Sequence, residues 1–260
     1  MTPIEYPTCP VCETISGAYS LITGEYSIIK CPHCGLEYTS PIPTNEDLVE
    51  FYGNYENIRA NPEIVQINAS RNLSLLKKYG LTESSSILDY GAGNGEFVEV
   101  AGPRCFGVEL SSRIKGNRIF ESLNDLPVKH FDFISLWGVL EHLNDITSSM
   151  KEIMERLRIG GFLVITTVDA EGIIPYYYKP PEHLTYWTRK SINILLEKNG
   201  LEVMEIKPYE MFQLSEIYMD RLLSRTPDEY KETILSSCGE LPEIITVPTN
   251  EIFVVAKRIS

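Results

Sequence analysis

One stretch of the chain, Ile87 to Phe97, restricts the possible folds more than any other. Its residues are Ile-Leu-Asp-Tyr-Gly-Ala-Gly-Asn-Gly-Glu-Phe, so a segment suited to a short buried strand, Ile87 to Tyr90, is followed at once by three alternating glycines. Glycine adopts positive φ and leaves room for a ligand against the backbone. A helix is expected to begin near Glu96, and the free N–H groups at a helix start favour an electronegative group. The stretch therefore predicts an α/β fold with a ligand-binding turn.

Two common nucleotide-binding loops fit these residues poorly. A phosphate-binding P-loop needs Gly-Lys-Ser/Thr, whereas Gly95 is followed by Glu96 and Phe97, which supply neither a cation nor a hydroxyl. A dinucleotide-binding loop has the spacing G-x-G-x-x-G, but Gly91, Gly93 and Gly95 follow G-x-G-x-G. A nucleotide-dependent oxidoreductase is therefore a disfavoured alternative.

Two acidic residues accompany the glycines. Asp89 lies just before them, and Glu109 lies eighteen residues after Gly91, within a second predicted strand from Cys105 to Leu110. A carboxylate at the end of that strand can accept hydrogen bonds from both hydroxyls of an adenosine ribose, and it would repel a 2′-phosphate. These residues favour an adenosine-containing ligand.

With these residues in place, the sequence resembles the class I S-adenosylmethionine (SAM)-dependent methyltransferases. The similar segments are the first motif at Ile87–Phe97, the ribose-binding strand end at Gly107–Ser111, the fourth motif at Phe131–Leu143, and the helix, turn and strand around Leu157–Ile165. Each match alone is weak, and the order and spacing together make the resemblance strong. The resemblance implies a Rossmann-like, mostly parallel seven-stranded sheet with its last strand antiparallel and helices on both faces. It also implies an enzyme that uses SAM as methyl donor.

The resemblance also implies a set of cofactor-binding residues. These are Asp89, Gly91, Gly93, Gly95, Glu109 and Leu110, with Trp137 near the methionine moiety and Ser122 and Leu123 near the adenine. The adenine contacts stay in doubt, because the crossover before the third strand, Arg118 to Leu123, is short enough to leave about one helical turn. Tyr52 and Tyr55 either line the methionine end, as tyrosines do in similar methyltransferases, or pack in the core.

Four of the six cysteines lie in the first 34 residues. Cys9, Cys12, Cys31 and Cys34 follow Cys-x2-Cys-x18-Cys-x2-Cys, a spacing that presents four thiolates to one Zn²⁺. In a reducing compartment a metal is favoured over disulfides. A segment this short buries little core, so the zinc is expected to be structural. His33 is expected to be outer shell or exposed, because Cys34 already completes the spacing.

The predicted domains are a zinc ribbon at 1–45 and a methyltransferase domain at 46–260. The second includes a helical cover at 46–80, with a helix starting at Asn61, a substrate-wall segment at 169–187 and a helical insertion at 208–245. A helix carrying Ile146, Met150, Ile153 and Leu157 is expected to stop at Gly160-Gly161, before a strand from Phe162 to Val168. A helix starting at Thr188 and a capping box at Thr226–Glu229 are also predicted.

The substrate wall is rich in aromatic residues. We expect Tyr176, Tyr178, Tyr186 and Trp187 to contact the methyl acceptor. The wall contains a Pro-Pro-Glu-His-Leu element similar to one in bacterial small-molecule methyltransferases with amino-terminal cysteine knuckles. Its histidine, His183, is the preferred catalytic base, and His142 after the fourth motif competes for that role. Histidine suits the task because its pKa near 6.5 leaves it largely neutral at cellular pH.

Composition limits the partners. A formal net charge of −13 disfavours nucleic acid and anionic membranes as partners. No apolar run reaches the length of a membrane span, and the first residues lack the features of a signal peptide, so a cytoplasmic protein is expected. The expected reaction is methyl transfer to a small-molecule acceptor, with a sugar oxygen favoured by the resemblance. N- or C-methylation and a non-catalytic SAM-binding regulatory module are the alternatives, and the oligomeric state stays open.

Overall fold

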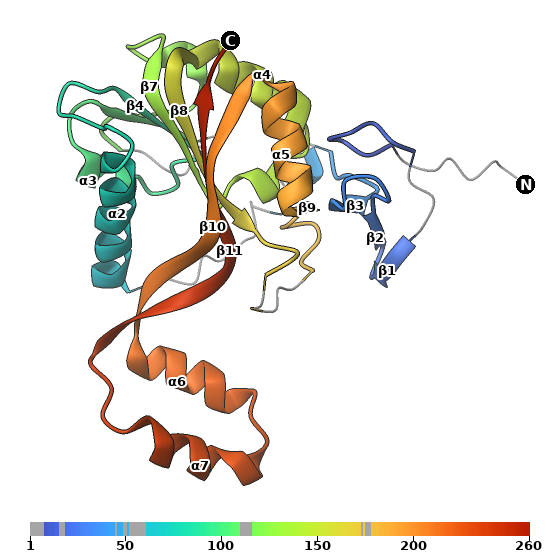
Figure 1. Ribbon diagram of the computed structural model, residues 1–260, viewed down its shortest axis with the longest axis vertical. Coiled ribbons are helices and arrows are strands. Elements are labelled where there is room, and N and C mark those ends of the chain that lie inside the picture. The colour runs from blue at the N-terminus through green and yellow to red at the C-terminus, as the bar shows by residue number, and fades with distance from the viewer. Residues whose placement is uncertain are drawn as a thin grey trace, which may run out of the picture.

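The structure is a computed structural model that describes residues 8–15, 19–44, 46–48, 51, 61–109, 116–172, 174 and 178–260. Its centre is a seven-stranded sheet in the order β10-β11-β8-β7-β4-β5-β6 (Figure 1). The strands are β4 (Ile87–Tyr90), β5 (Cys105–Val108), β6 (Ile119–Phe120), β7 (Phe131–Trp137), β8 (Leu157–Val168), β10 (Leu201–Leu214) and β11 (Ile244–Arg258). The pairs from β6 to β8 are parallel, and β11 is antiparallel to both β8 and β10. The predicted fold class is confirmed.

Helices cover both faces of this sheet. Helices α2 (Pro62–Lys77) and α3 (Glu96–Ala101) lie on one side, and α4 (Ile146–Arg156) and α5 (Arg189–Lys198) on the other (Figure 1). Successive strand residues point to opposite faces, so Ile87 packs in the core cluster under α2 while Leu88 packs in the cluster under α4 and α5. The sheet is therefore buried on both sides, as parallel sheets require.

The predicted starts of α2 and α5 are confirmed by their caps. Asn61 accepts hydrogen bonds from the N–H groups of Glu63 and Ile64, at 2.9 and 3.3 Å. Thr188 accepts one from the N–H of Ser191 at 3.0 Å. Each cap satisfies backbone donors that have no partner within the helix.

The predicted end of α4 is wrong. The helix stops at Arg156, and Leu157 already pairs with Phe131 of β7. Gly160 and Gly161 lie inside β8, where the register with β7 shifts. A Cβ on Gly161 would lie 2.8 Å from the carbonyl oxygen of Asp132, so glycine permits the close approach of the two strands there. The two glycines thus form an irregularity in a strand rather than a helix stop.

Three smaller predictions also need correction. Strand β6 comprises only Ile119–Phe120, because Arg118 has a φ of 69° and Ser122 caps the short 3-10 helix η1 (Leu123–Asp125). The last strand is longer than expected and begins at Ile244. The capping box at Thr226 is absent, since the Thr226 hydroxyl donates to the carbonyl of Leu222 at 2.8 Å.

Strands β10 and β11 continue past the sheet as a long hairpin (Figure 1). Helices α6 (Ser215–Ser224) and α7 (Asp228–Cys238) lie at its tip, within the predicted insertion, and neither helix contains a buried residue. Among the described residues, no helix is both long and apolar enough to cross a membrane.

The cysteine-rich segment forms a second, smaller sheet. Its strands β1 (Tyr19–Thr23), β2 (Tyr26–Lys30) and β3 (Glu37–Ser40) are antiparallel, and β3 also pairs with β9 (Thr185–Tyr186) from the predicted substrate wall. Leu36 and Tyr38 belong to the same core cluster as Trp187 and Ile192. The segment therefore packs tightly on the main sheet, and the domain boundary at residue 45 stays a prediction.

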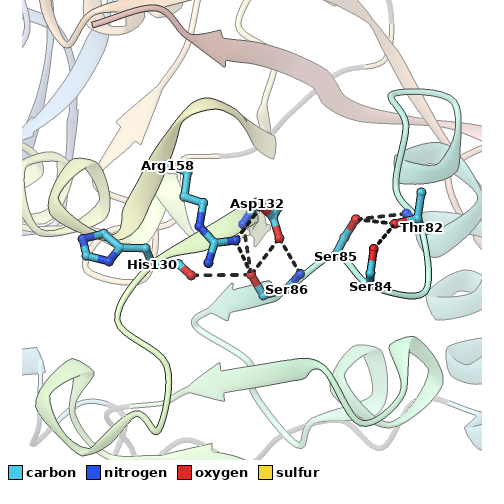
Figure 2. Close-up of polar contacts among 7 residues, drawn as sticks. All are labelled: Thr82, Ser84, Ser85, Ser86, His130, Asp132 and Arg158. Atoms are coloured by element: carbon cyan, nitrogen blue, oxygen red, sulfur yellow. Dashed lines mark hydrogen bonds and ion pairs between the residues drawn. The ribbon is translucent and has the colours of Figure 1, made fainter.

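A polar network lies at the amino-terminal ends of three neighbouring strands of the main sheet, β4, β7 and β8. Asp132 accepts hydrogen bonds from the N–H and hydroxyl of Ser86 at 2.8 and 2.9 Å, and from Nη1 of Arg158 at 2.6 Å (Figure 2). These residues lie where β4, β7 and β8 begin. In parallel sheets ligands bind at the opposite edge, beyond the carboxyl ends of the strands, so this network has a structural role.

Candidate functional site

The candidate site lies at the carboxyl ends of the parallel strands. Strand β4 has β5 as its neighbour on one side and β7 as its neighbour on the other. Such a reversal of strand order leaves a crevice where open α/β sheets bind ligands. The predicted cofactor residues Asp89, Glu109 and Trp137 all lie at these strand ends.

The glycine loop joins β4 to α3. Gly91 has a φ of 77°, and a Cβ there would lie 2.6 Å from Cγ2 of Val139. Gly93 has a φ of 52°, and nothing described lies within 4 Å of a Cβ placed on it, so this part of the loop has free space beside it. The N–H of Gly93 donates to Oε2 of Glu109 at 3.0 Å. The structure thus brings the predicted loop and the predicted ribose-binding carboxylate together, with Gly95 capping α3 beside them.

Asp89 is a buried carboxyl group at the end of β4. The hydroxyl of Ser135, on the neighbouring strand β7, donates to its Oδ1 at 2.7 Å. Burial raises the pKa of Asp89 to about 7, and the charges of Glu109 and Glu96 act in the same direction. A bound cation would stabilise the ionised form. Sequence reasoning did not identify Ser135, because a serine within an apolar strand has no distinguishing motif.

Trp137 ends β7 among aromatic neighbours. Its ring meets Phe97 edge to face at 5.4 Å and stacks on Phe253 at 6.4 Å. Its Nε1 is buried and has no hydrogen-bond partner among the residues described. Buried indole N–H groups usually have a partner, so this donor is available to a ligand.

Not every predicted cofactor residue can be placed. Ser122 and Leu123 are half-buried beside β6, where the Ser122 hydroxyl accepts from the N–H of Asn124 at 3.2 Å. Their contact with adenine stays a prediction. Tyr52, Tyr55, Leu110 and the predicted substrate residue Tyr176 lie outside the described residues.

The structure brings the two predicted histidines together. His142 ends the 3-10 helix η2 (Leu140–His142), and its ring lies 4.9 Å from that of His183, edge to face. Nδ1 of His142 lies 2.7 Å from the carbonyl oxygen of Glu182. Nδ1 of His183 is buried without a hydrogen-bond partner in the described part of the chain. One ligand atom each from Glu141, His142 and His183 lie within 4.8 Å of one another.

Burial keeps both histidines neutral, because it lowers the pKa of each ring. Burial, together with the charges of His142 and Lys179, lowers the pKa of His183 to about 3. Burial also lowers the pKa of His142. Both rings are therefore unprotonated imidazoles at neutral pH.

Two carboxyl groups accompany the histidine pair. Glu141 is 3% exposed and accepts a hydrogen bond from the hydroxyl of Thr167 at 2.8 Å. Burial raises its pKa to about 7, and burial together with the charge of Glu141 does the same for Glu251 of β11. Sequence reasoning gave no role to Glu141, Thr167 or Glu251. Only the adjacency of Glu141 to His142 after a strand end was a usable signal.

The predicted substrate wall is partly a packing element. Tyr186 and Trp187 are both 0% exposed, so contact of either side chain with an acceptor would require this segment to move. Tyr178 is half-buried, lies 4.9 Å from the ring of Tyr186, and donates its hydroxyl to Oε2 of Glu37 at 2.6 Å. Glu37 comes from the cysteine-rich segment, which sequence reasoning had not connected to the wall.

The four predicted metal ligands form one cluster. Sγ of Cys9 lies 3.6 Å from that of Cys34, and Sγ of Cys12 lies 3.4 Å from that of Cys31. All four sulfur atoms lie within 4.8 Å of one another, and the cysteines are not joined by disulfides. Tetrahedral zinc with Zn–S bonds of about 2.3 Å separates its sulfurs by about 3.8 Å, so the cluster fits this ion. His33 is exposed, as expected.

Comparison with known proteins identifies the fold and the family. A family model described as a methyltransferase domain matches residues 64–206, more than half of the chain. No curated protein matches the sequence. The fold is similar to that of 1,6-didemethyltoxoflavin-N1-methyltransferase from Burkholderia thailandensis, solved with bound S-adenosylhomocysteine, at 15% identity and a TM-score of 0.52 over 94% of this chain and 100% of that one. It is also similar to that of the [4+2]-cyclase SpnF, at 14% identity and a TM-score of 0.50 over 83% and 96% of the two chains.

Proposed function

The chain belongs to the methyltransferase-domain family, and we propose that it transfers the methyl group of SAM to an oxygen of a small-molecule acceptor, with sugars and related metabolites as the leading class. One observation carries the proposal. A glycine loop with free space beside Gly93, the carboxylate of Glu109 at that loop, and the buried carboxyl of Asp89 lie together at the strand ends. This arrangement suits a ligand with an adenosine ribose at one end and a cation at the other.

Each part of this arrangement has a role in binding SAM. Glu109 accepts hydrogen bonds from the ribose hydroxyls, and charge-assisted bonds of this kind are stronger than neutral ones. Asp89 supplies the negative charge that favours the positively charged methionine end. The indole N–H of Trp137, which has no partner among the described residues, lies at the carboxyl ends of the same strands. The S-adenosylhomocysteine bound by the Burkholderia protein, which has the same fold, supports this assignment.

Methyl transfer is a direct displacement. The sulfonium of SAM makes its methyl group electrophilic, so that the acceptor oxygen forms a bond to the methyl carbon as the carbon–sulfur bond breaks. Alignment of the reacting atoms supplies much of the rate, with about 7–11 kcal/mol available in favourable intramolecular models. This displacement does not need the zinc. We propose that the zinc is structural and is held by Cys9, Cys12, Cys31 and Cys34.

We assign the acceptor's hydroxyl proton to Nδ1 of His183, because this nitrogen has no hydrogen-bond partner among the described residues. The nitrogen is buried, so this segment would have to move for an acceptor to reach it. A pKa of about 3 keeps this nitrogen unprotonated but makes it a weak base, and the carboxyl group of Glu141, which has an oxygen within 4.8 Å of a ring nitrogen of His183, would stabilise the imidazolium that forms. His142 is the alternative base. Its Nδ1 lies 2.7 Å from the carbonyl oxygen of Glu182, so this nitrogen already has a partner.

For the acceptor we propose only a chemical class, sugars and related metabolites. We propose that it binds beside Tyr178, near the histidine pair. Tyr186 and Trp187 are fully buried and would contact it only if this segment moved, and Tyr176 lies outside the described residues. N- or C-methylation of a small metabolite is the alternative chemistry. A non-catalytic SAM-binding role is a second candidate, because the fold alone does not fix the activity: a protein with a similar fold is a [4+2]-cyclase.

A methyl-transfer screen tests the proposal. Purified protein with radiolabelled SAM would be incubated with sugars, nucleotide-sugars, phenols and amines, and methylated product counted. His183→Ala should lower kcat about 10²–10⁴-fold on a hydroxyl acceptor and leave SAM binding unchanged. His130→Ala, an exposed histidine, is the matched control. If His183→Ala stays within a few-fold of wild type while His142→Ala abolishes turnover, His142 is the base. SAM binding without transfer to any acceptor would favour the regulatory role.

A further inference from the structure

The cysteine-rich segment makes direct contact with the backbone of the candidate base. Thr39 of β3 donates its N–H to the carbonyl of Leu184 at 2.9 Å and its hydroxyl to the carbonyl of His183 at 3.2 Å. Thr39 is fully buried, so water does not compete for either bond. The two preceding residues of β3 continue the contact as paired strands, Tyr38 with Thr185 and Glu37 with Tyr186.

The opposite side of the His183 segment is held by the main domain. The N–H of Leu184 donates to the carbonyl of Glu141 at 2.7 Å, and Nδ1 of His142 lies 2.7 Å from the carbonyl of Glu182. Residues 182–184 are therefore fixed between η2 on one side and β3 on the other. Loss of either side would leave backbone groups without partners and let the His183 ring shift.

Two of the cysteines lie at the turn that leads into β3. The N–H of Cys31 donates to the carbonyl of Leu36 at 2.8 Å, and the N–H of Gly35 donates to that of Cys31 at 3.0 Å. The carbonyl of Cys34 accepts a hydrogen bond from the hydroxyl of Thr188 at 2.8 Å. A metal ion joining Cys31 and Cys34 to the first cysteine pair would hold this turn closed, and with it the start of β3.

Strand β3 also orders the aromatic wall. Glu37 is 5% exposed and accepts hydrogen bonds from the hydroxyl of Tyr178 at 2.6 Å and from Nζ of Lys30 at 2.9 Å. Tyr178 packs on Tyr186, whose hydroxyl donates to the carbonyl of His183 at 3.3 Å. A second chain of contacts thus runs from β3 to the same histidine.

We propose that the cysteine cluster, when it holds its metal, positions the acceptor half of the active site through β3, with Thr39 and Glu37 as positioning residues for His183 and Tyr178. The inference rests on the proposed function in taking His183 as the acceptor's base. The glycine loop and Glu109 directly follow β4 and β5, and among the described residues neither strand pairs with the small sheet. Metal loss should therefore disturb the acceptor side and leave SAM binding largely intact.

The test uses the zinc-loaded full chain and the nuclear magnetic resonance signal of the His183 imidazole, assigned by its loss in His183→Gln. Thr39→Val removes one hydroxyl from the His183 carbonyl and should shift this signal, and Thr39→Ser should restore it. The matched control is Thr226→Val, which removes a similar bond from a threonine hydroxyl to a backbone carbonyl on the distant hairpin. The dissociation constant for SAM should change less than about threefold in all three variants.

Zinc removal gives a second, independent reading. On chelation, the amides of 183–186 should exchange with solvent at least tenfold faster, together with those of β3, while the amides of β4 keep their protection. An unshifted His183 signal in Thr39→Val, or unchanged exchange at 183–186 after complete zinc loss, would overturn the inference. Should Thr39→Val fail to fold, the chelation experiment on the wild-type chain decides alone. Both readouts report position whether or not His183 accepts a proton, so a wrong base assignment would not be mistaken for a wrong positioning role.

Discussion

At the scale of single residues, two carboxyl groups carry the account of SAM binding. Glu109 already accepts a hydrogen bond from Gly93, so its position is set before a ligand arrives. Asp89 accepts a hydrogen bond from Ser135, and its burial raises its pKa although that bond acts in the opposite direction. Asp89 and Glu109 could be predicted from the sequence because their spacing from the glycines is local. Ser135 and Glu251 could not, because their roles depend on which strands become neighbours.

Removing the ribose acceptor should weaken SAM binding. Glu109→Ala is expected to cost about 2 kcal/mol, or roughly thirtyfold in the dissociation constant, because two charge-assisted hydrogen bonds are lost. Calorimetry would measure it. Glu99→Ala, at an exposed position of α3, is the control and should bind as the wild type does. An unchanged affinity in a folded Glu109→Ala variant would place the ribose elsewhere.

Asp89 should make SAM binding depend on pH. Its pKa is raised to about 7, so the group is ionised at pH 8 and mostly protonated at pH 6. Because the carboxylate is the form that attracts a cation, binding should weaken as the pH falls, by about tenfold between pH 8 and pH 6. In Asp89→Asn, which keeps an acceptor for Ser135, this slope should vanish. An equal slope in wild type and Asp89→Asn would mean that another group titrates.

At the scale of elements, sequence reasoning succeeded where the signal was local. The strand before the glycine loop and the helices starting at Asn61 and Thr188 each carry their own boundary residues. It failed at the start of β8, because pairing of Leu157 with β7 overrides the helical spacing that Leu157 continues. The long hairpin of β10 and β11 was also underestimated, since its pairing partners are far apart in the chain.

Helix α2 is joined to β10 by a polar contact that apolar spacing does not reveal. Asn68 is 7% exposed; its Oδ1 accepts from the N–H of Phe212 at 2.8 Å and its Nδ2 donates to the Phe212 carbonyl at 2.9 Å. Asn68→Ala should lower the free energy of unfolding by about 2 kcal/mol, because it leaves backbone groups without partners. Denaturant unfolding would measure the loss. Ser74→Ala on the exposed side of α2 should change stability little, and equal losses in the two variants would contradict this role for Asn68.

At the scale of the whole molecule, the two sheets are joined by β3 and β9 into one structure. The predicted cofactor residues lie at the carboxyl ends of the parallel strands, and the cysteine-rich segment contacts the neighbouring His183 segment. The sequence indicated both parts, but their contact could not be predicted from it. The pairing of β3 with β9 joins residues about 150 positions apart, and no local pattern signals such a pair.

Metal content tests how the two clusters of candidate ligands are used. The purified chain should contain about one zinc, held by the four cysteines, and Cys31→Ser should lower that content. His183→Ala should leave it unchanged, because His183 is assigned to proton transfer. A second bound metal that is lost in His183→Ala would show instead that Glu141, His142 and His183 are metal ligands.

The central claim, that the crevice at the strand ends binds SAM, is tested most directly by titrating the zinc-loaded chain with SAM and separately with NAD in a calorimeter. The account predicts one SAM site per chain and no measurable binding of NAD, because the loop spacing and Glu109 suit a single adenosine with a cationic tail. Tight binding of NAD without binding of SAM would contradict it.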